Sequence, residues 1–271
     1  MLEMKSLITF VSCFYHVSSK HDINLYISWI DNFISLVDTF NLVIFTNKES
    51  IQFIDTKNNP KIKVILKPYE DFYTFPYQDF WILNHQRNHS LKHRIDWKVN
   101  MIWNEKVWFV RETMEKGYFQ TEYYAWCDIG YFRNRSCDLS TFQLKHWPRW
   151  NRILRLDKTK IHYGCVCNST TIQNLSEIVN HKNFLGLPVD PIPENQVSVA
   201  GNFFLLHKQT VVQWTDLYYS KLKLYIENDY LVKDDQIILV DCILSNRDAF
   251  ELHYEYKRFD NWFMFQRIFF Q

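Results

Sequence analysis

Glycine and proline are scarce in this chain of 271 residues, which has 5 and 7 of them. No low-complexity tract or evident linker accompanies them, so we expect one continuous folded domain. Long apolar runs are also missing, since none reaches the roughly 18 to 20 residues that span a bilayer. Charge of one sign is not in excess either, because the formal net charge is +1. A near-neutral chain argues against nucleic acid as the main partner.

Cysteine is present, but without the spacing of a thiolate metal site. Six cysteines occur at positions 13, 127, 137, 165, 167 and 242, and no two form a CxxC pair. A structural zinc site of that kind therefore lacks support. Cys165 and Cys167 flank one residue, which in a strand places both on the same face. We expect reduced, structural thiols in a cytosol-like compartment.

Hydrophobic residues, by contrast, are abundant. They make up 47% of the chain against 23% charged residues, which argues against disorder. The length supplies a core for one large α/β domain. Aromatic residues reach 18%, and the abundance of Phe, Tyr, Ile, Asn and Lys is typical of an AT-rich genome, such as that of a large DNA virus.

Both ends of the chain carry short apolar segments. Residues 7–15, LITFVSCFY, lack a following cleavage site, so we expect a first core strand that is not removed as a signal peptide. Residues 261–271, NWFMFQRIFFQ, predict a segment packed on the domain. A membrane-surface anchor is the alternative for this tail. The expected location is the cytoplasm, or the host cytoplasm for a viral protein, with peripheral membrane contact if the tail is an anchor.

Hydrophobic periodicity predicts strands that alternate with helices. The pattern is typical of a mostly parallel sheet with helices on both faces. The second half is less regular, and we assign the whole chain to one domain. Strands are expected at residues 6–14, 41–47, 61–68, 123–128, 152–156, 161–167, 198–207 and 250–254, and helices at 22–37, 76–91, 96–116, 209–227 and 234–245.

Polar residues mark the strands of the first half. In open α/β sheets, ligands bind beyond the carboxyl ends of the strands. Ser12, Thr46, Asn47 and Asp128 are expected near one such rim. Together with Thr9, the first three are candidate ligand contacts on strand position alone.

Six segments occur in a fixed order along the chain: YISWIDNFISL, LVIFTN, IWNEKVWFVRE, YYAWCDIGYFR, VAGNFFLLH and DDQIILVDCIL. Their order and spacing resemble the HtrL/YibB family from about residue 7 to 254. Its members are expected to be glycosyltransferases of the GT-A nucleotide-sugar fold. The resemblance implies that residues 1–130 hold the nucleotide and that residues 131–271 hold the acceptor and form the tail.

The resemblance also implies a metal ion bridging the donor diphosphate, Mn²⁺ or Mg²⁺. Most such enzymes carry Asp-x-Asp, whereas the DIG stretch here keeps Asp128 and has Gly130 in place of the second acid. A hard cation prefers several oxygen ligands. In related GT-A families a histidine near the end of the domain often adds a ligand, and His253 stands at about that place. The alternatives are a strand-end or helix-capping role for Asp128 and an ordinary polar role for His253.

Four further positions are candidate donor contacts. Gly130 is either a turn glycine or a place where sugar or phosphate approaches the backbone. In VAGNFF, Gly201 marks close backbone approach or a β-bulge, and the amide of Asn202 is suited to sugar hydroxyls. Lys106 either offsets the charge of the diphosphate or lies on a solvated helix face.

The KDDQ stretch precedes an apolar helix, so one of its two acids is expected to cap that helix. The resemblance suggests that the other faces the acceptor and accepts the proton of its hydroxyl. We assign Asp234 to the cap, Asp235 to the base and Gln236 to a sugar contact.

These expectations combine into a metal-dependent glycosyltransferase. It would move a sugar from a nucleotide-diphosphate sugar, of UDP type, to a hydroxyl of a glycan, lipid or protein. The alternative is a non-catalytic protein that keeps the fold and binds carbohydrate or nucleotide, since abundant Trp and Tyr suit sugar stacking.

Overall fold

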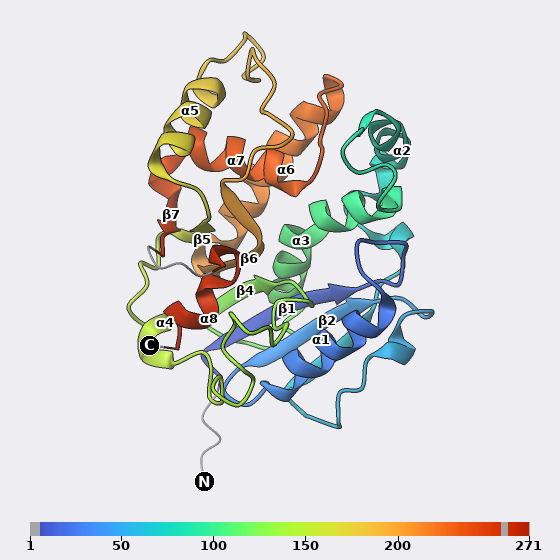
Figure 1. Ribbon diagram of the computed structural model, residues 1–271, viewed down its shortest axis with the longest axis vertical. Coiled ribbons are helices and arrows are strands. Elements are labelled where there is room, and N and C mark those ends of the chain that lie inside the picture. Colours follow the sequence, from blue (N-terminus) through green and yellow to red (C-terminus); the bar gives the residue numbers. More distant parts are fainter. Residues whose placement is uncertain (1–5, 256–259, 271) are drawn as a thin grey trace.

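The computed structural model describes residues 6–255 and 260–270. Within this part, seven strands form one sheet in the order β3-β2-β1-β4-β6-β5-β7 (Figure 1). The strands are β1 (Ile8–Phe14), β2 (Asn41–Thr46), β3 (Ile62–Leu66), β4 (Tyr123–Cys127), β5 (Ile161–Cys165), β6 (Val199–His207) and β7 (Phe250–His253).

The sheet is mixed but mostly parallel. The strands β3, β2, β1 and β4 run parallel, as does β5 with β7. Only β6 among the described strands runs the other way, pairing antiparallel with β4 and β5. The α/β class and the mostly parallel sheet are therefore confirmed.

Helices cover both faces of the sheet, as expected. The helices α2, α3, α5, α6 and α7 contribute to the core on one face, and α1, α4 and α8 to the core on the other. Their bounds are α1 (Ile23–Ser35), α2 (Gln78–Arg87), α3 (Trp97–Glu115), α4 (Trp150–Ile153), α5 (Ser169–Asn180), α6 (Val211–Glu227), α7 (Asp235–Ser245) and α8 (Met264–Ile268).

Capping side chains explain where four of the helices begin. The side-chain oxygens of Asp22, Asp96, Asn168 and Asp234 each accept a backbone N–H from the first turn of α1, α3, α5 and α7. Such a bond satisfies one of the amide donors that a helix start leaves unpaired. The caps therefore set the start of α3 and α7, the two helices that later contribute to the site.

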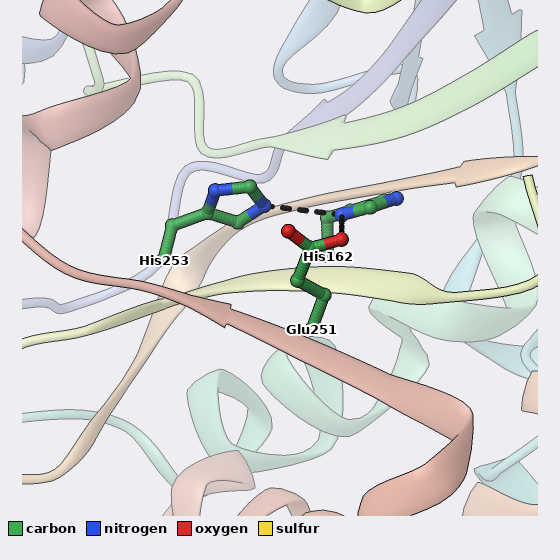
Figure 2. A group of neighbouring side chains, drawn as sticks. All are labelled: His162, Glu251 and His253. Carbon is green, nitrogen blue, oxygen red and sulfur yellow. Dashed lines mark hydrogen bonds and ion pairs between the residues drawn. The ribbon is translucent and has the colours of Figure 1, made fainter. Parts of the chain in front are cut away.

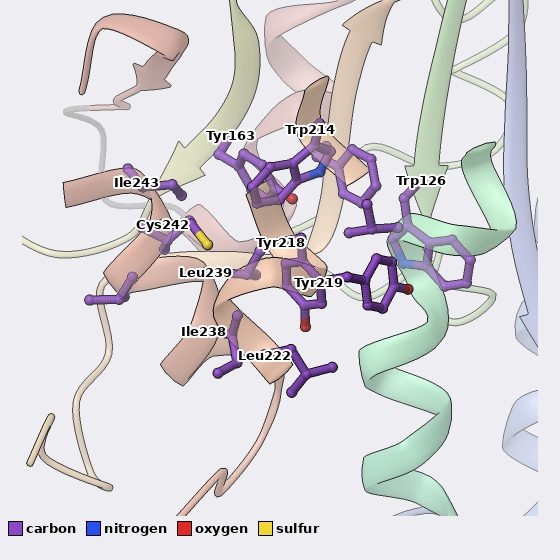
Figure 3. Close-up of a cluster of buried hydrophobic side chains, with 14 of the residues drawn as sticks. Trp126, Tyr163, Trp214, Tyr218, Tyr219, Leu222, Ile238, Leu239, Cys242 and Ile243 are labelled. Atoms are coloured by element: carbon purple, nitrogen blue, oxygen red, sulfur yellow. The ribbon is translucent and has the colours of Figure 1, made fainter. Parts of the chain in front are cut away.

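Aromatic side chains fill the core on the α6–α7 face. Figure 3 shows Trp126 of β4 and Tyr163 of β5 beside Trp214 and Tyr218 of α6. Tyr163 and Trp214 meet edge to face, with ring centroids 5.9 Å apart. Such contacts add stability beyond the apolar area that they bury, so the high aromatic content has a structural use.

The C-terminal segment packs on the opposite face of the sheet. Phe265 stacks on Phe203 of β6 with ring centroids 4.5 Å apart, and Phe269 is fully buried. The expectation of a packed tail is confirmed, while a contact of the tail with a membrane surface stays a prediction. No helix in the described part of the chain is long and apolar enough to cross a membrane.

Two expectations in the second half were wrong or incomplete. Residues 152–156, expected as a strand, form the end of α4 and a turn, because their backbone hydrogen bonds are local, as from Leu154 N to Trp150 O. Ile153 is buried while Leu154 is 55% exposed, and Ile153 and Leu156 have the i, i+3 spacing of a helical turn. The helix α5 was missed, although Asn168 caps it and its apolar residues recur at helical spacing.

We expect Phe203→Ala to lower the free energy of unfolding by about 3–5 kcal/mol, because it leaves a cavity in a fully buried aromatic cluster. Phe203 is 0% exposed and contacts Phe10, Tyr131 and Phe265. Urea denaturation measures the change. Phe142→Ala is the control, since Phe142 is 86% exposed and its loss should change little. Similar losses in both variants would contradict this account of the core.

Candidate functional site

Two adjoining clefts open at the point where the order of strands in the sheet changes direction. After β1 the chain continues to β2 on one side, while β4 lies on the other, and such switch points form ligand crevices. The aromatic cleft, of about 400 Å³, is lined by residues that follow β1 and β4. The polar cleft, of about 320 Å³, adds residues from β6 and the start of α7. Both are lined by Trp103, Lys106, Asp128 and Arg133, and both volumes suit a small-molecule ligand.

Lys106 lies at the centre of the two clefts. Its Nζ lies 3.1 Å from Asp128 Oδ1, 3.0 Å from Asp235 Oδ2 and 2.9 Å from the carbonyl oxygen of Gly201. The contact to Gly201 O is a hydrogen bond, and the other two pair the ammonium with a carboxylate. Burial alone lowers the pKa of Lys106, but the two carboxylates outweigh it and raise the pKa above its ordinary range. The alternative of a solvated helix face is therefore wrong.

Asp128 follows β4 directly and lines both clefts, as the strand-end prediction requires. Trp126 Nε1 donates to its Oδ1 at 2.6 Å, and the backbone N–H of Asp128 donates to Asn202 O at 2.9 Å. The contacts described for its carboxylate all fall on Oδ1, and 35% of the side chain is exposed. Oδ2 is therefore available to a ligand or a cation in the cleft.

The two acids of KDDQ have different surroundings. Asp234 caps α7 by accepting from Gln236 N at 3.2 Å, and it pairs with Lys233 at 2.9 Å. Asp235 is 5% exposed and pairs with Lys106. Burial raises the pKa of Asp235 to about 6, while the charge of Lys106 opposes this rise. The assignment of the cap to Asp234 is confirmed, and Asp235 and Gln236 both line the polar cleft.

The two predicted glycines allow close packing of side chains. A Cβ at Gly201 would lie 2.9 Å from Asp235 Oδ2, and one at Gly130 would lie 2.7 Å from the ring of Trp29. Close approach at Gly201 was expected, but the approaching group is the Asp235 carboxylate. Gly130 lies in a turn, since Tyr131 N donates to Asp128 O across it, and it also lines the aromatic cleft, so its contact with a donor stays a prediction.

Asn202 presents an unpaired oxygen beside the polar cleft. Its Nδ2 donates to Trp262 O at 2.9 Å, while its Oδ1 is buried without a hydrogen-bond partner in the described structure. Asn202 lies across from Asp128 on the paired strand. A buried amide oxygen without a donor costs free energy, so a ligand donor or a cation would stabilise it.

Sequence reasoning missed the cations and aromatic residues that line the clefts. The guanidinium of Arg133 lies over the Trp29 ring at 4.4 Å, and its Nε donates to Gly130 O. The ammonium of Lys20 lies over the Trp103 ring at 4.9 Å. The position of Arg133, five residues after Asp128, was a signal in the sequence, whereas nothing local marked Lys20.

Four predicted contacts do not line either cleft. Thr9 is near the amino end of β1, where its hydroxyl bonds Thr121. Ser12 is buried in the same strand. The hydroxyl of Thr46 donates to Phe14 O, and Asn47 Oδ1 accepts from Ser50 N in a turn. The prediction that these residues contact a ligand does not match the clefts, because the clefts open at the ends of β1 and β4 and not at the end of β2.

His253 also lies outside both clefts, whereas Asp128 lines them, so the cleft residues do not include the second metal ligand that was expected. Its Nε2 lies 3.0 Å from Nδ1 of His162, the buried histidine of β5. Burial lowers the pKa of both rings, and that of His253 falls to about 4. The expected ligand therefore belongs to a separate cluster with His162 and Glu251.

Comparisons with known proteins agree with the ordered motifs. Residues 13–271 match the profile of a family described as a bacterial protein of unknown function, HtrL_YibB. Protein HtrL of Escherichia coli (strain K12) is 24% identical over 154 residues, which cover 57% of this chain and 47% of that protein. The match thus spans about half the length of this curated relative. The viral origin suggested by composition stays a prediction.

We expect Lys106→Met to destabilise the protein in a pH-dependent way. At pH 7.5 it leaves two neighbouring carboxylates without their cation, a loss of about 3–5 kcal/mol for a broken buried pair. The folded-state pKa of Asp235, about 6, exceeds its ordinary value of 3.8, and removing Lys106 raises it further. The folded variant therefore holds a proton more tightly than the unfolded chain, and its stability falls as pH rises.

Urea denaturation at pH 5 and pH 7.5 tests this expectation, with the larger loss at pH 7.5. Lys208→Met is the control, because Lys208 is 46% exposed and pairs only at the surface with Glu122. Its loss should stay below about 1 kcal/mol at either pH. An equal loss of unfolding free energy for Lys106→Met at pH 5 and pH 7.5 would show that the charge of Lys106 does not affect the pKa of Asp235.

Proposed function

The chain belongs to the HtrL_YibB family of bacterial proteins of unknown function, and we propose that it is a glycosyltransferase with a GT-A-like domain. The donor would be a nucleotide-diphosphate sugar of UDP type. The acceptor would be a hydroxyl group of a glycan, a lipid or a protein. Residues 1–130 would bind the nucleotide, and residues 131–271 would complete the site on the acceptor side.

One observation carries the proposal. Asp128 at the end of β4 and Asp235 at the start of α7 converge on Lys106, inside clefts at the carboxyl ends of the strands. Two carboxylates and one ammonium leave the group with one net negative charge. Such a group suits a cation and a reacting hydroxyl better than it suits a purely structural core.

The aromatic cleft supports binding of the nucleotide part of the donor. Tyr26, Trp29, Trp103 and Trp126 line it, and planar rings suit stacking with a base or a sugar. Arg133 lines both clefts and Lys20 lines the polar one. Their charges favour a diphosphate at the junction of the clefts.

The polar cleft offers oxygen atoms for a divalent cation. Oδ2 of Asp128 and the unpaired Oδ1 of Asn202 come from neighbouring positions on β4 and β6. Oxygen ligands suit Mn²⁺ or Mg²⁺, and diphosphate oxygens would complete the set. When bound, the ion would supply positive charge to the departing diphosphate.

Asp235 is the residue we assign to proton acceptance from the acceptor hydroxyl. Asp235 and Gln236 both line the polar cleft, and we assign a contact with the sugar to Gln236. The pKa of Asp235, about 6, lies close to the value that suits a general base at neutral pH. Lys106 orients its carboxylate by the 3.0 Å contact to Oδ2.

We expect Asp128→Asn to weaken Mn²⁺-dependent UDP binding by at least about tenfold, since even residues behind the direct ligands contribute that much to metal affinity. Calorimetry of UDP binding with and without Mn²⁺ measures it. Asp157→Asn is the control, because Asp157 lies outside both clefts and should not affect binding. Unchanged Mn²⁺-dependent affinity in Asp128→Asn would remove the main argument for the proposed donor site.

We expect Asp235→Asn to lower kcat by about 10²–10⁴-fold while KM for the donor changes little, as for loss of a general base. Steady-state release of UDP from UDP-sugars, with Mn²⁺ and candidate acceptors, measures both constants. Asp234→Asn is the control, because Asn caps a helix as well as Asp does. Parent activity in Asp235→Asn together with loss in Asp234→Asn would reverse the two roles. Donor binding without any turnover would instead indicate a non-catalytic binding protein.

A further inference from the structure

Three ligand-type side chains meet on two neighbouring strands, away from the clefts. His162 of β5 pairs in register with Glu251 of β7, and Gly164 pairs with His253. Since side chains alternate along a strand, all three ligand-type residues point to one face. Their ligand atoms lie within 4.8 Å of one another (Figure 2).

The orientation of His162 is fixed by a backbone carbonyl. Its Nε2 lies 2.9 Å from Asp157 O, and because a carbonyl only accepts, Nε2 must carry the proton. Nδ1 of the neutral ring is then a lone-pair donor aimed at the other two side chains. A histidine held in this way by its second nitrogen is the usual arrangement of a metal-binding imidazole.

Nδ1 of His162 has two close neighbours, and one of these two contacts has no proton to form a hydrogen bond. It lies 3.0 Å from His253 Nε2 and 3.3 Å from Glu251 Oε2. His253 can donate a proton to Nδ1, but the carboxylate of Glu251 has none to share with it when ionised. A cation placed among the three atoms would replace this mismatch with three favourable contacts.

We propose that His162, Glu251 and His253 bind one Zn²⁺ ion. Two imidazoles and one carboxylate are a known zinc ligand set that leaves a fourth position for water. Nitrogen ligands disfavour the harder Mg²⁺ and Ca²⁺. The site is separate from the donor site, because none of its three residues lines either cleft.

The position of the site also suggests what the ion does. β7 is the edge strand of the sheet, with only four residues, and among the described strands it pairs with β5 alone. His162 is fully buried, whereas the Glu251 side chain is 46% exposed. Zinc would therefore tie a short edge strand to its buried neighbour and keep one coordination position toward solvent.

The test is calorimetric titration of the full chain with Zn²⁺ after treatment with a chelator. We expect one ion per chain and a higher melting temperature with Zn²⁺, as for any ligand of the folded state. Glu251→Gln should weaken Zn²⁺ binding by at least about tenfold. Glu122→Gln is the matched control, because Glu122 is 51% exposed and lies 3.5 Å from a single histidine, His207. This variant should keep the Zn²⁺ affinity of the parent chain.

Two further variants separate this site from its neighbours. The thiols of Cys165 and Cys167 lie 3.7 Å apart, and their double replacement by Ser should leave Zn²⁺ affinity unchanged. Asp128→Asn should also keep Zn²⁺ affinity, whatever happens to UDP binding. Loss of binding in the serine variant, parent affinity in Glu251→Gln, or absence of saturable binding at one ion per chain would each overturn the proposal.

Discussion

The buried ammonium of Lys106 is the interaction on which the candidate site depends. It joins α3 to the end of β4, to β6 and to the start of α7 through Asp128, Gly201 and Asp235. A buried ammonium is tolerated only when it is paired and hydrogen-bonded, and here two carboxylates and one carbonyl oxygen surround it. The same contacts fix two carboxylates from distant parts of the chain at one point, so one ion pair network sets both the local stability and the geometry of the clefts.

Scarce glycines make this arrangement possible. A side chain at Gly201 would displace the Asp235 carboxylate, and one at Gly130 would displace the Trp29 ring on which Arg133 stacks. A third glycine, Gly164, lies two residues after His162 on β5 and lets Met264 of α8 pack against the strand. These glycines thus lie where the sheet must admit another group, which explains why a chain so rich in large aromatic residues keeps them there.

Most of the helices and strands could be predicted from local patterns in the sequence. The strands around Val11, Val43 and Ala125 are short apolar runs bounded by polar residues, and α3 and α7 begin at capping acids; both signals are local in the chain. Asp128 could be assigned to a strand end for the same reason. The prediction was wrong at residues 152–156, because a run of five residues with three apolar ones fits one helical turn as well as a short strand.

Residue patterns alone were thus enough to predict most of the elements in their order, the α/β class, the capping role of Asp234 and the strand-end position of Asp128. The tertiary structure decided which of the polar residues meet. Strand order placed Thr46 and Asn47 away from the clefts, brought Lys20 and Arg133 into them, and paired His253 with His162 instead of Asp128. These contacts join residues far apart in the chain, and their distances follow from sheet register and crossover, which no local pattern of residues encodes.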